Sequence, residues 1–252
     1  MAGHSKWAQI KHQKMAADAR RGQLFTKLAR EITIAARQGG GDVQTNPRLR
    51  LAVERAREAN MPMENIQRAI RRGTGQGEEQ TRLEEVVYEG YGPGGIAILV
   101  QAVTENRNRT VSEIRSVLER GGGKMGGVGS VSWLFEQKGV LTLEEPNPRR
   151  AESIALEAID LGAEDFVLDG SFLEVRCPPE RFEALRKALE EKGITFASAE
   201  LALVPKTTVP LDPATSEQVV RLLDRLEDLD DVQKVYTNAD FPNEVLEGYR
   251  AA

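Results

Sequence analysis

Apolar residues in the first third of the chain recur every three or four positions, as they do along one side of an α-helix. Between residues 23 and 38 they are Leu24, Phe25, Leu28, Ile32, Ala35 and Ala36. The same spacing predicts a second helix after Asn46-Pro47, a favourable cap and first position, and a third from about Pro62 to Gly73. Three short amphipathic helices bury their apolar stripes against one another, so residues 23–75 are predicted to form a three-helix bundle.

After residue 81, short strand patterns alternate with single helices. The expected strands are 85–89, 96–103, 131–135, 139–143, 165–168, 172–176, 195–204 and 232–236, and the expected helices are 109–120, 148–161, 179–192 and 213–226. The strands 131–135 and 139–143 are expected to form one hairpin. The strands 165–168 and 172–176 are expected to form another around Asp169-Gly170, a frequent hairpin dipeptide. Single helices between strands and hairpins predict ferredoxin-like α/β sandwiches.

The order of these elements also predicts the domain organisation. Residues 81–130 hold two strands and one helix, too few to close a sheet with one covered face, and residues 205–240 supply a further helix and strand. We therefore expect a discontinuous α/β domain, 81–130 plus 205–240, with a second α/β domain, 131–204, inserted in it. A basic tail (1–22), the helical domain (23–75) and a C-terminal tail (241–252) complete a multi-domain α+β protein.

Charge divides the chain into two unlike parts. Residues 1–75 carry fifteen Lys and Arg against six Asp and Glu, a net charge of +9, whereas the remaining residues carry a net charge of −14. The overall charge of −5 would argue against nucleic acid, but the division favours one basic module that binds a polyanion and an acidic body that does not.

The candidate nucleic-acid contacts are cations of the tail and helices together with an aromatic and a histidine. They are Lys6, Trp7, Lys11, His12, Lys14, Arg20, Arg21, Lys27, Arg30, Arg37, Arg68 and Arg71. Such residues can neutralise phosphates and stack on a base, although a basic tail can also be a solvated chain end. Trp7 leaves two alternatives open, packing on the helical bundle or stacking on an unpaired base.

A second candidate anion site lies at the expected strand-to-helix junction 104–110. Thr110 could cap the helix, with Glu113 completing a capping box. Capping does not explain Arg107 and Arg109, because a helix N-terminus disfavours cations and attracts anions. These two arginines are therefore candidate ligands of a bound anion.

The chain has too few histidines and cysteines to build a hydrolytic, redox or metal site of the common kinds. Both histidines lie in the tail, and the single cysteine, Cys177, is interpreted as a structural thiol in a reducing cytoplasm. The glycine-rich run 121–126 has GxGxxG spacing but follows a helix, so we interpret it as a flexible connector. The acidic run 227–231 is interpreted as a solvated helix end. We expect no enzymatic activity, cofactor, metal, small-molecule substrate or membrane association.

Several motifs resemble the YebC/PmpR family. They are AGHSKW (2–7), IKH (10–12), NP (46–47), NMP (60–62), YEGYGP (88–93), NRNRT (106–110), GSV (129–131) and DDVQKVY (230–236). The resemblance implies a helical first domain, two α/β domains and a cytoplasmic bacterial protein, usually described as a DNA-binding transcriptional regulator. It also implies kinship with a mitochondrial translational activator and a ribosome-associated role when proline-rich sequences stall synthesis. The expected partner is thus DNA or, alternatively, ribosomal RNA.

Overall fold

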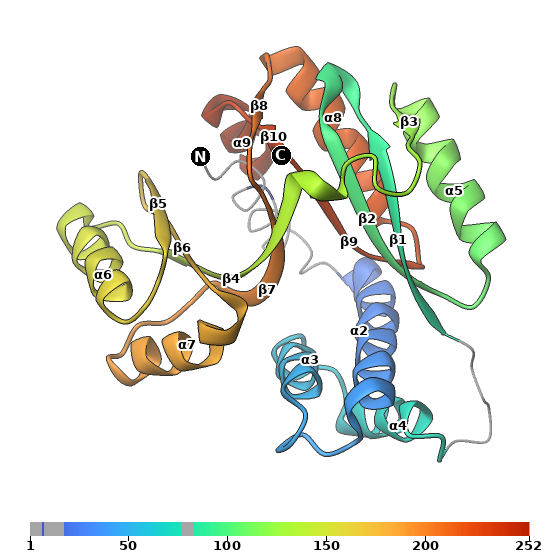
Figure 1. The fold of residues 1–252 in the computed structure, drawn as a ribbon, viewed down its shortest axis with the longest axis horizontal. Coiled ribbons are helices and arrows are strands. Elements are labelled where there is room, and N and C mark those ends of the chain that lie inside the picture. Colours follow the sequence, from blue (N-terminus) through green and yellow to red (C-terminus); the bar gives the residue numbers. More distant parts are fainter. Residues whose placement is uncertain (1–6, 8–17, 77–82, 252) are drawn as a thin grey trace.

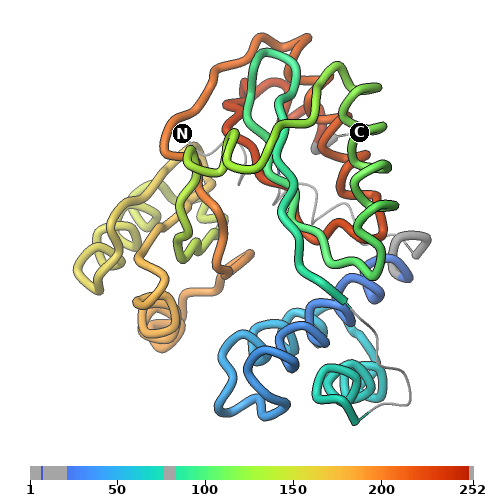
Figure 2. Tube along the Cα trace, turned by 45° about the vertical axis from the view of Figure 1, so that its right-hand side comes forward, coloured from blue at the N-terminus to red at the C-terminus, as the bar shows by residue number. Residues whose placement is uncertain are grey.

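The computed structural model describes residues 7, 18–76 and 83–251 of the chain, which form three lobes (Figures 1 and 2). The first lobe consists of three helices, α2 (Asp18–Gly39), α3 (Pro47–Glu58) and α4 (Met63–Gly73). Their core contains Leu28, Ile32, Leu49, Val53 and Ile66, the apolar stripes seen in the sequence. We call this lobe the helical module.

Local capping explains where α3 begins and ends. The Asn46 side chain accepts a hydrogen bond from Leu49 N at 3.0 Å and donates one to the Ala35 carbonyl oxygen at 2.9 Å, so it caps α3 and ties it to α2. After α3, Asn60 adopts a left-handed conformation with φ of 59°, and Met61 N donates back to the Ala56 carbonyl oxygen at 2.8 Å. This C-cap turns the chain sharply into α4.

The second lobe contains a four-stranded antiparallel sheet with the order β3-β1-β2-β9. Its strands are β1 (Glu84–Tyr91), β2 (Ala97–Thr104), β3 (Lys124–Met125) and β9 (Val232–Thr237). Helices α5 (Arg107–Arg120) and α8 (Pro213–Glu227) pack on one face, and α9 (Asn243–Ala251) packs on α8. The apolar core between this sheet and its helices includes Ile98, Ile114, Leu118, Leu223 and Val235.

The third lobe lies between β3 and α8 in the sequence and has the β-α-β-β-α-β connectivity of the ferredoxin-like motif. Its elements are β4 (Phe135–Glu144), α6 (Pro148–Asp160), β5 (Asp165–Asp169), β6 (Phe172–Cys177), α7 (Phe182–Glu191) and β7 (Ser198–Pro205). The antiparallel sheet has the order β5-β6-β4-β7. The sheet of the second lobe therefore includes β9, which follows all four strands of the third lobe's sheet in the sequence. The predicted α+β class, a helical region followed by two sheet-containing domains, is confirmed.

One predicted hairpin is wrong. Residues 132–134 form a 3-10 turn, η2 (Ser132–Leu134), and β4 runs through Gly139 as one ten-residue strand. Gly139 suggested a turn, but its role is close packing: a Cβ there would lie 2.6 Å from Cys177 Sγ and 2.7 Å from Phe182 Cδ2. The missing side chain lets the start of α7 rest directly on β4.

The remaining elements are short. They are η1 (Pro93–Gly95), η3 (Pro179–Arg181) and the parallel pair β8 (Val209–Pro210) and β10 (Ala239–Asp240). None of the helices in the described part of the chain is long and apolar enough to cross a membrane.

Candidate nucleic-acid interface

Helix α4 presents a polar face to solvent and an apolar face to α2. Ile66 and Ala69 are buried, whereas Gln67, Arg68 and Arg71 are exposed. The end of α4 sits directly on α2, because a Cβ at Gly73 would lie only 2.3 Å from the carbonyl oxygen of Thr33. This close approach fixes the outward direction of the Gln67, Arg68 and Arg71 positions.

The arginines of this face differ from the others in the helical module. Within the described residues, Arg57, Arg68, Arg71 and Arg72 form no ion pair or side-chain hydrogen bond. Arg57 lies at the end of α3, Arg68 in the middle of α4, and Arg71 and Arg72 in the last turn of α4. Guanidinium groups without an acidic partner attract phosphate.

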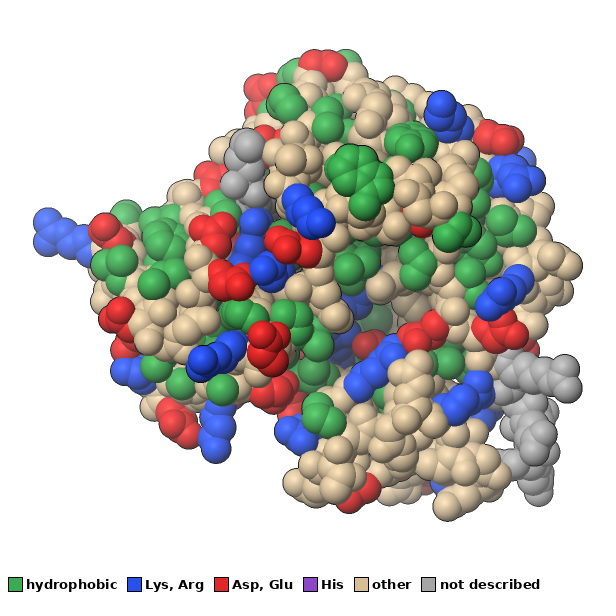
Figure 3. Space-filling model, viewed as in Figure 1, with side chains coloured by type: hydrophobic (Ala, Val, Ile, Leu, Met, Phe, Trp, Pro, Cys, Tyr) green, Lys and Arg blue, Asp and Glu red, His purple; other side chains and the backbone are tan. Residues whose placement is uncertain are grey.

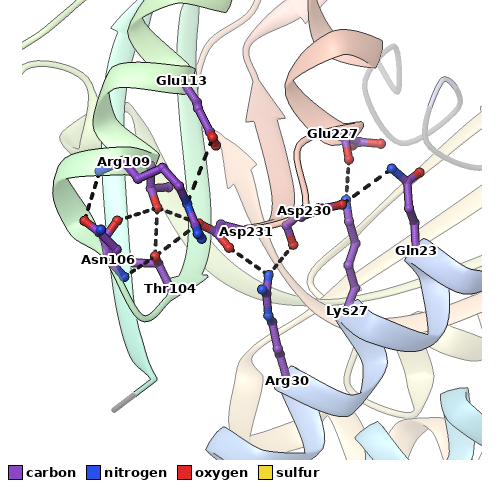
Figure 4. Close-up of polar contacts among 11 residues, drawn as sticks. Gln23, Lys27, Arg30, Thr104, Asn106, Arg109, Glu113, Glu227, Asp230 and Asp231 are labelled. Carbon is purple, nitrogen blue, oxygen red and sulfur yellow. Dashed lines mark hydrogen bonds and ion pairs between the residues drawn. The ribbon is translucent and has the colours of Figure 1, made fainter. Parts of the chain in front are cut away.

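The cations of α2 have a different environment. Lys27 donates to the Glu227 carbonyl oxygen, and Arg30 forms an ion pair of 2.9 Å with Asp231 (Figure 4). Gln23 reaches Asp230 from one turn earlier, and Arg37 donates to the Leu83 carbonyl oxygen at 2.6 Å. The predicted contacts Lys27, Arg30 and Arg37 therefore hold the helical module to the second lobe and are not free for nucleic acid in this arrangement.

Asp231 is the centre of that contact and is almost completely buried. Its carboxylate accepts hydrogen bonds from Thr110 Oγ1 at 2.7 Å, Thr104 Oγ1 at 3.1 Å and Arg109 Nη2 at 2.7 Å, and it also pairs with Arg30 (Figure 4). Burial raises the pKa of Asp231, but the hydrogen bonds from Arg109 and Thr110 and the charges of Arg30 and Arg109 outweigh it and hold the pKa below its ordinary value.

The predicted second anion site is thus occupied by the protein's own carboxylates. Arg109 binds Asp231, and Arg107 pairs with Glu84. The cap of α5 is Asn106, whose side chain accepts from Arg109 N at 3.1 Å, while the Thr110 hydroxyl turns inward to Asp231. Arg109 is stable at this helix start because it binds Asp231, an internal anion. Asp231 belongs to the acidic run 227–231, which the sequence pattern alone predicts to be a solvated helix end.

A second ion network joins all three lobes. Arg55 of α3 pairs with Glu31 of α2 at 2.9 Å and with Glu200 of β7 at 2.8 Å, and Glu200 also binds Lys234 of β9. Burial lowers the pKa of Arg55, but Glu31 and Glu200 outweigh it and raise the pKa. At the rim, Arg48 pairs with Glu85 of β1. Much of the positive charge counted in the helical module is therefore used to dock it onto the acidic body.

Trp7 lies in the core of the second lobe. Its side chain is 0% exposed, in the same apolar cluster as Ile96, Leu118 and Val219. Packing is therefore the alternative that the structure supports, although the partner is the second lobe and not the helical bundle. A ring with no exposed face cannot stack on a base while it remains there.

The other tail candidates lie outside the described residues. These are Lys6, Lys11, His12 and Lys14, together with the side chains of Arg20 and Arg21. Their role as phosphate contacts stays a prediction.

Sites for catalysis and metal binding are not evident in the described residues. No group of three His, Cys, Asp or Glu side chains among them could hold a metal ion. Cys177 is buried, and desolvation raises the pKa of its thiol to about 11, so the reactive thiolate is scarce at neutral pH.

Comparison with known proteins identifies the family. Residues 5–76 match the TACO1/YebC protein N-terminal domain, and residues 83–239 match the TACO1/YebC second and third domain. Probable transcriptional regulatory proteins from Moorella thermoacetica and Dictyoglomus turgidum are 54% and 51% identical, each over 98% of this chain and 98% and 99% of the relative. A crystal structure of a conserved hypothetical protein from Aquifex aeolicus is 44% identical, covering 89% of this chain and 92% of that one with a TM-score of 0.80. The chain therefore belongs to the TACO1/YebC family.

Proposed function

We propose that this protein is a non-enzymatic regulator of gene expression that binds duplex DNA through the exposed face of α4. The names of its relatives support a transcriptional regulator. The observation that carries the proposal is the contrast between Arg57, Arg68, Arg71 and Arg72, which have no partner among the described residues, and Arg30, Arg48 and Arg55, which are paired with the acidic body.

The arrangement of α3 and α4 suits this role. A four-residue link joins them, and the second helix carries its polar side chains outward, as a recognition helix does in the major groove. Gln67 and Arg68 lie in the middle of α4, from where they would reach base edges, and Arg71 and Arg72 lie at its end, where they would contact phosphates. Lys6, Lys11 and Lys14 of the tail would add further phosphate contacts.

The experiment compares the double variant Arg68→Gln/Arg71→Gln with a matched control, Arg149→Gln/Arg221→Gln. The control removes the same charge from exposed arginines of α6 and α8. We expect the α4 variant to bind duplex DNA at least about tenfold more weakly, and its salt dependence to fall by about one unit for each phosphate that it no longer neutralises. Equal affinities of the two double variants at two salt concentrations would refute the α4 face as the binding surface.

A further inference from the structure

The segment between β3 and β4 carries an aromatic side chain that the core does not use. Trp133 is 65% exposed, although burying an indole would contribute strongly to a core. Its ring is nevertheless held, because Nε1 donates to the Ser130 carbonyl oxygen at 3.2 Å. A large apolar ring kept in a defined orientation on the surface is typical of a binding contact.

The backbone under Trp133 is fixed by Glu89 of β1. Its carboxylate, 7% exposed, accepts hydrogen bonds from Gly129 N at 2.6 Å, Val131 N at 2.7 Å and Ser132 N at 2.8 Å. Burial raises the pKa of Glu89, but these backbone N–H groups outweigh it and lower the pKa, so the carboxylate is charged at neutral pH. These three charge-assisted hydrogen bonds fix the backbone of residues 129–132, which directly precede Trp133.

Two lysines lie close to this segment. Lys206 Nζ donates to the Trp133 carbonyl oxygen at 3.0 Å. The Tyr91 hydroxyl donates to the same Ser130 oxygen as the indole, at 3.1 Å, and Lys124 Nζ lies 5.5 Å from the centre of the Tyr91 ring. Within the described residues, neither lysine pairs with an acidic side chain. We call Tyr91, Lys124, Trp133 and Lys206 the Trp133 surface.

The Trp133 surface continues into a shallow pocket. Tyr91 and Lys124 line a space of about 270 Å³ together with Gly92, Gly95, Gly122 and Gly123. Glycine walls let a ligand approach the backbone closely. Figure 3 shows acidic and basic side chains on both sheet-containing lobes, intermixed with apolar ones.

We propose that the Trp133 surface binds an unpaired base of a folded RNA. The indole would stack on the base, and Lys124 and Lys206 would neutralise nearby phosphates. A base inside a duplex has both faces covered by its neighbours, whereas folded RNA keeps bases unstacked in loops and bulges. An exposed aromatic ring near two lysines that lack acidic partners among the described residues offers both contacts that a nucleotide needs, a stacking face and cations for its phosphates.

This inference rests on the proposed function only in taking nucleic acid as the partner. The surface belongs to the second lobe and its junction with the third, and the α4 face belongs to the helical module. Duplex DNA probes the α4 face and RNA with unpaired bases probes the Trp133 surface, so either proposal can fail while the other stands.

The experiment uses the full chain, a short RNA hairpin with an unpaired loop, and a blunt RNA duplex with the sequence of the same stem. We expect Trp133→Ala to weaken binding of the hairpin at least about tenfold, Trp133→Phe to retain most of the affinity, and the blunt duplex to be insensitive to both. The control is Leu156→Ala, which truncates another exposed apolar side chain, 56% exposed on α6.

Fluorescence gives a direct readout because the chain has only two tryptophans, and the other, Trp7, is buried. Acrylamide should quench Trp133 in the free protein, and the hairpin should protect it. Equal affinity for hairpin and blunt duplex, equal effects of Trp133→Ala and Leu156→Ala, or an indole still open to acrylamide in the presence of bound hairpin would each overturn the proposal. Either of the last two results would indicate that the Trp133 surface contacts a protein partner instead of RNA.

Discussion

At the scale of single residues, the environment of a side chain decides its role more than its type does. The chain has two tryptophans, and they have opposite environments: Trp7 is enclosed in the core of the second lobe, and Trp133 stands on the surface. The cations divide in the same way, since Arg30 and Arg109 neutralise Asp231 while Arg68 and Arg71 face solvent. A charge count along the chain cannot separate these cases.

The two tryptophans can be separated by their effect on stability. We expect Trp7→Ala to lower the free energy of unfolding by about 3–5 kcal/mol, because it removes a buried aromatic and leaves a cavity. Trp133→Ala should change it by less than about 0.5 kcal/mol, as surface substitutions usually do. Denaturant titration of the two variants measures both values. A Trp7→Ala variant as stable as Trp133→Ala would show that Trp7 is not part of the core.

At the scale of elements, local rules explain the helices better than the strands. Asn46 caps α3 and Asn60 ends it with a left-handed residue, both through contacts within a few positions of the chain. Strand β4 behaves differently, because Gly139 is required by side chains of β6 and α7 that are distant in sequence. When only its sequence neighbours are considered, Gly139 suggests a turn and not the middle of a strand.

The packing at Gly139 predicts a clear stability effect. We expect Gly139→Ala to cost about 1–3 kcal/mol, because the added methyl group overlaps Cys177 and Phe182 and must displace α7. Gly127→Ala is the matched control, since no atom lies within 4 Å of a Cβ there. Thermal unfolding of both variants tests the difference. A Gly139→Ala variant as stable as the control would mean that α7 does not rest on β4 as described.

At the scale of the whole molecule, charge complementarity joins the basic module to the acidic body. Asp231 lies between Arg30 of α2 and Arg109 of α5, and Glu200 connects α3 to β7 and β9. The opposite net charges of the two parts thus serve assembly, while Arg57, Arg68, Arg71 and Arg72 keep no acidic partner among the described residues.

The Asp231 contact predicts how stability depends on pH. The folded-state pKa of Asp231 is lowered, so its carboxylate stabilises the fold above the unfolded pKa of about 3.9, and the contribution disappears as the pH falls through the folded value. We expect Asp231→Asn to cost about 1–3 kcal/mol near neutral pH, a range that allows for the half-exposed Arg109.

The measurement compares unfolding free energies of wild type and Asp231→Asn at neutral pH and below about pH 3. The difference should shrink in acid, and hydrogen exchange in α2 should be faster in the variant at neutral pH. Asp160→Asn, at an exposed position on α6, is the control. A stability difference that stays constant across this pH range would contradict an electrostatic role for Asp231.

The helices of the module, the alternation of strands and helices, and the family could all be predicted from the order of the amino acids. These features follow from local rules: the spacing of apolar positions, caps such as Asn46, and short motifs. Contacts between distant segments, which the folded structure shows, explain which charges meet, where Trp7 is buried and why residue 139 is glycine. Arg30 and Asp231 are 201 positions apart, and a repeating pattern shows that a side chain is buried or charged without showing its partner. The α4 face and the Trp133 surface emerged only after those long-range partners were known.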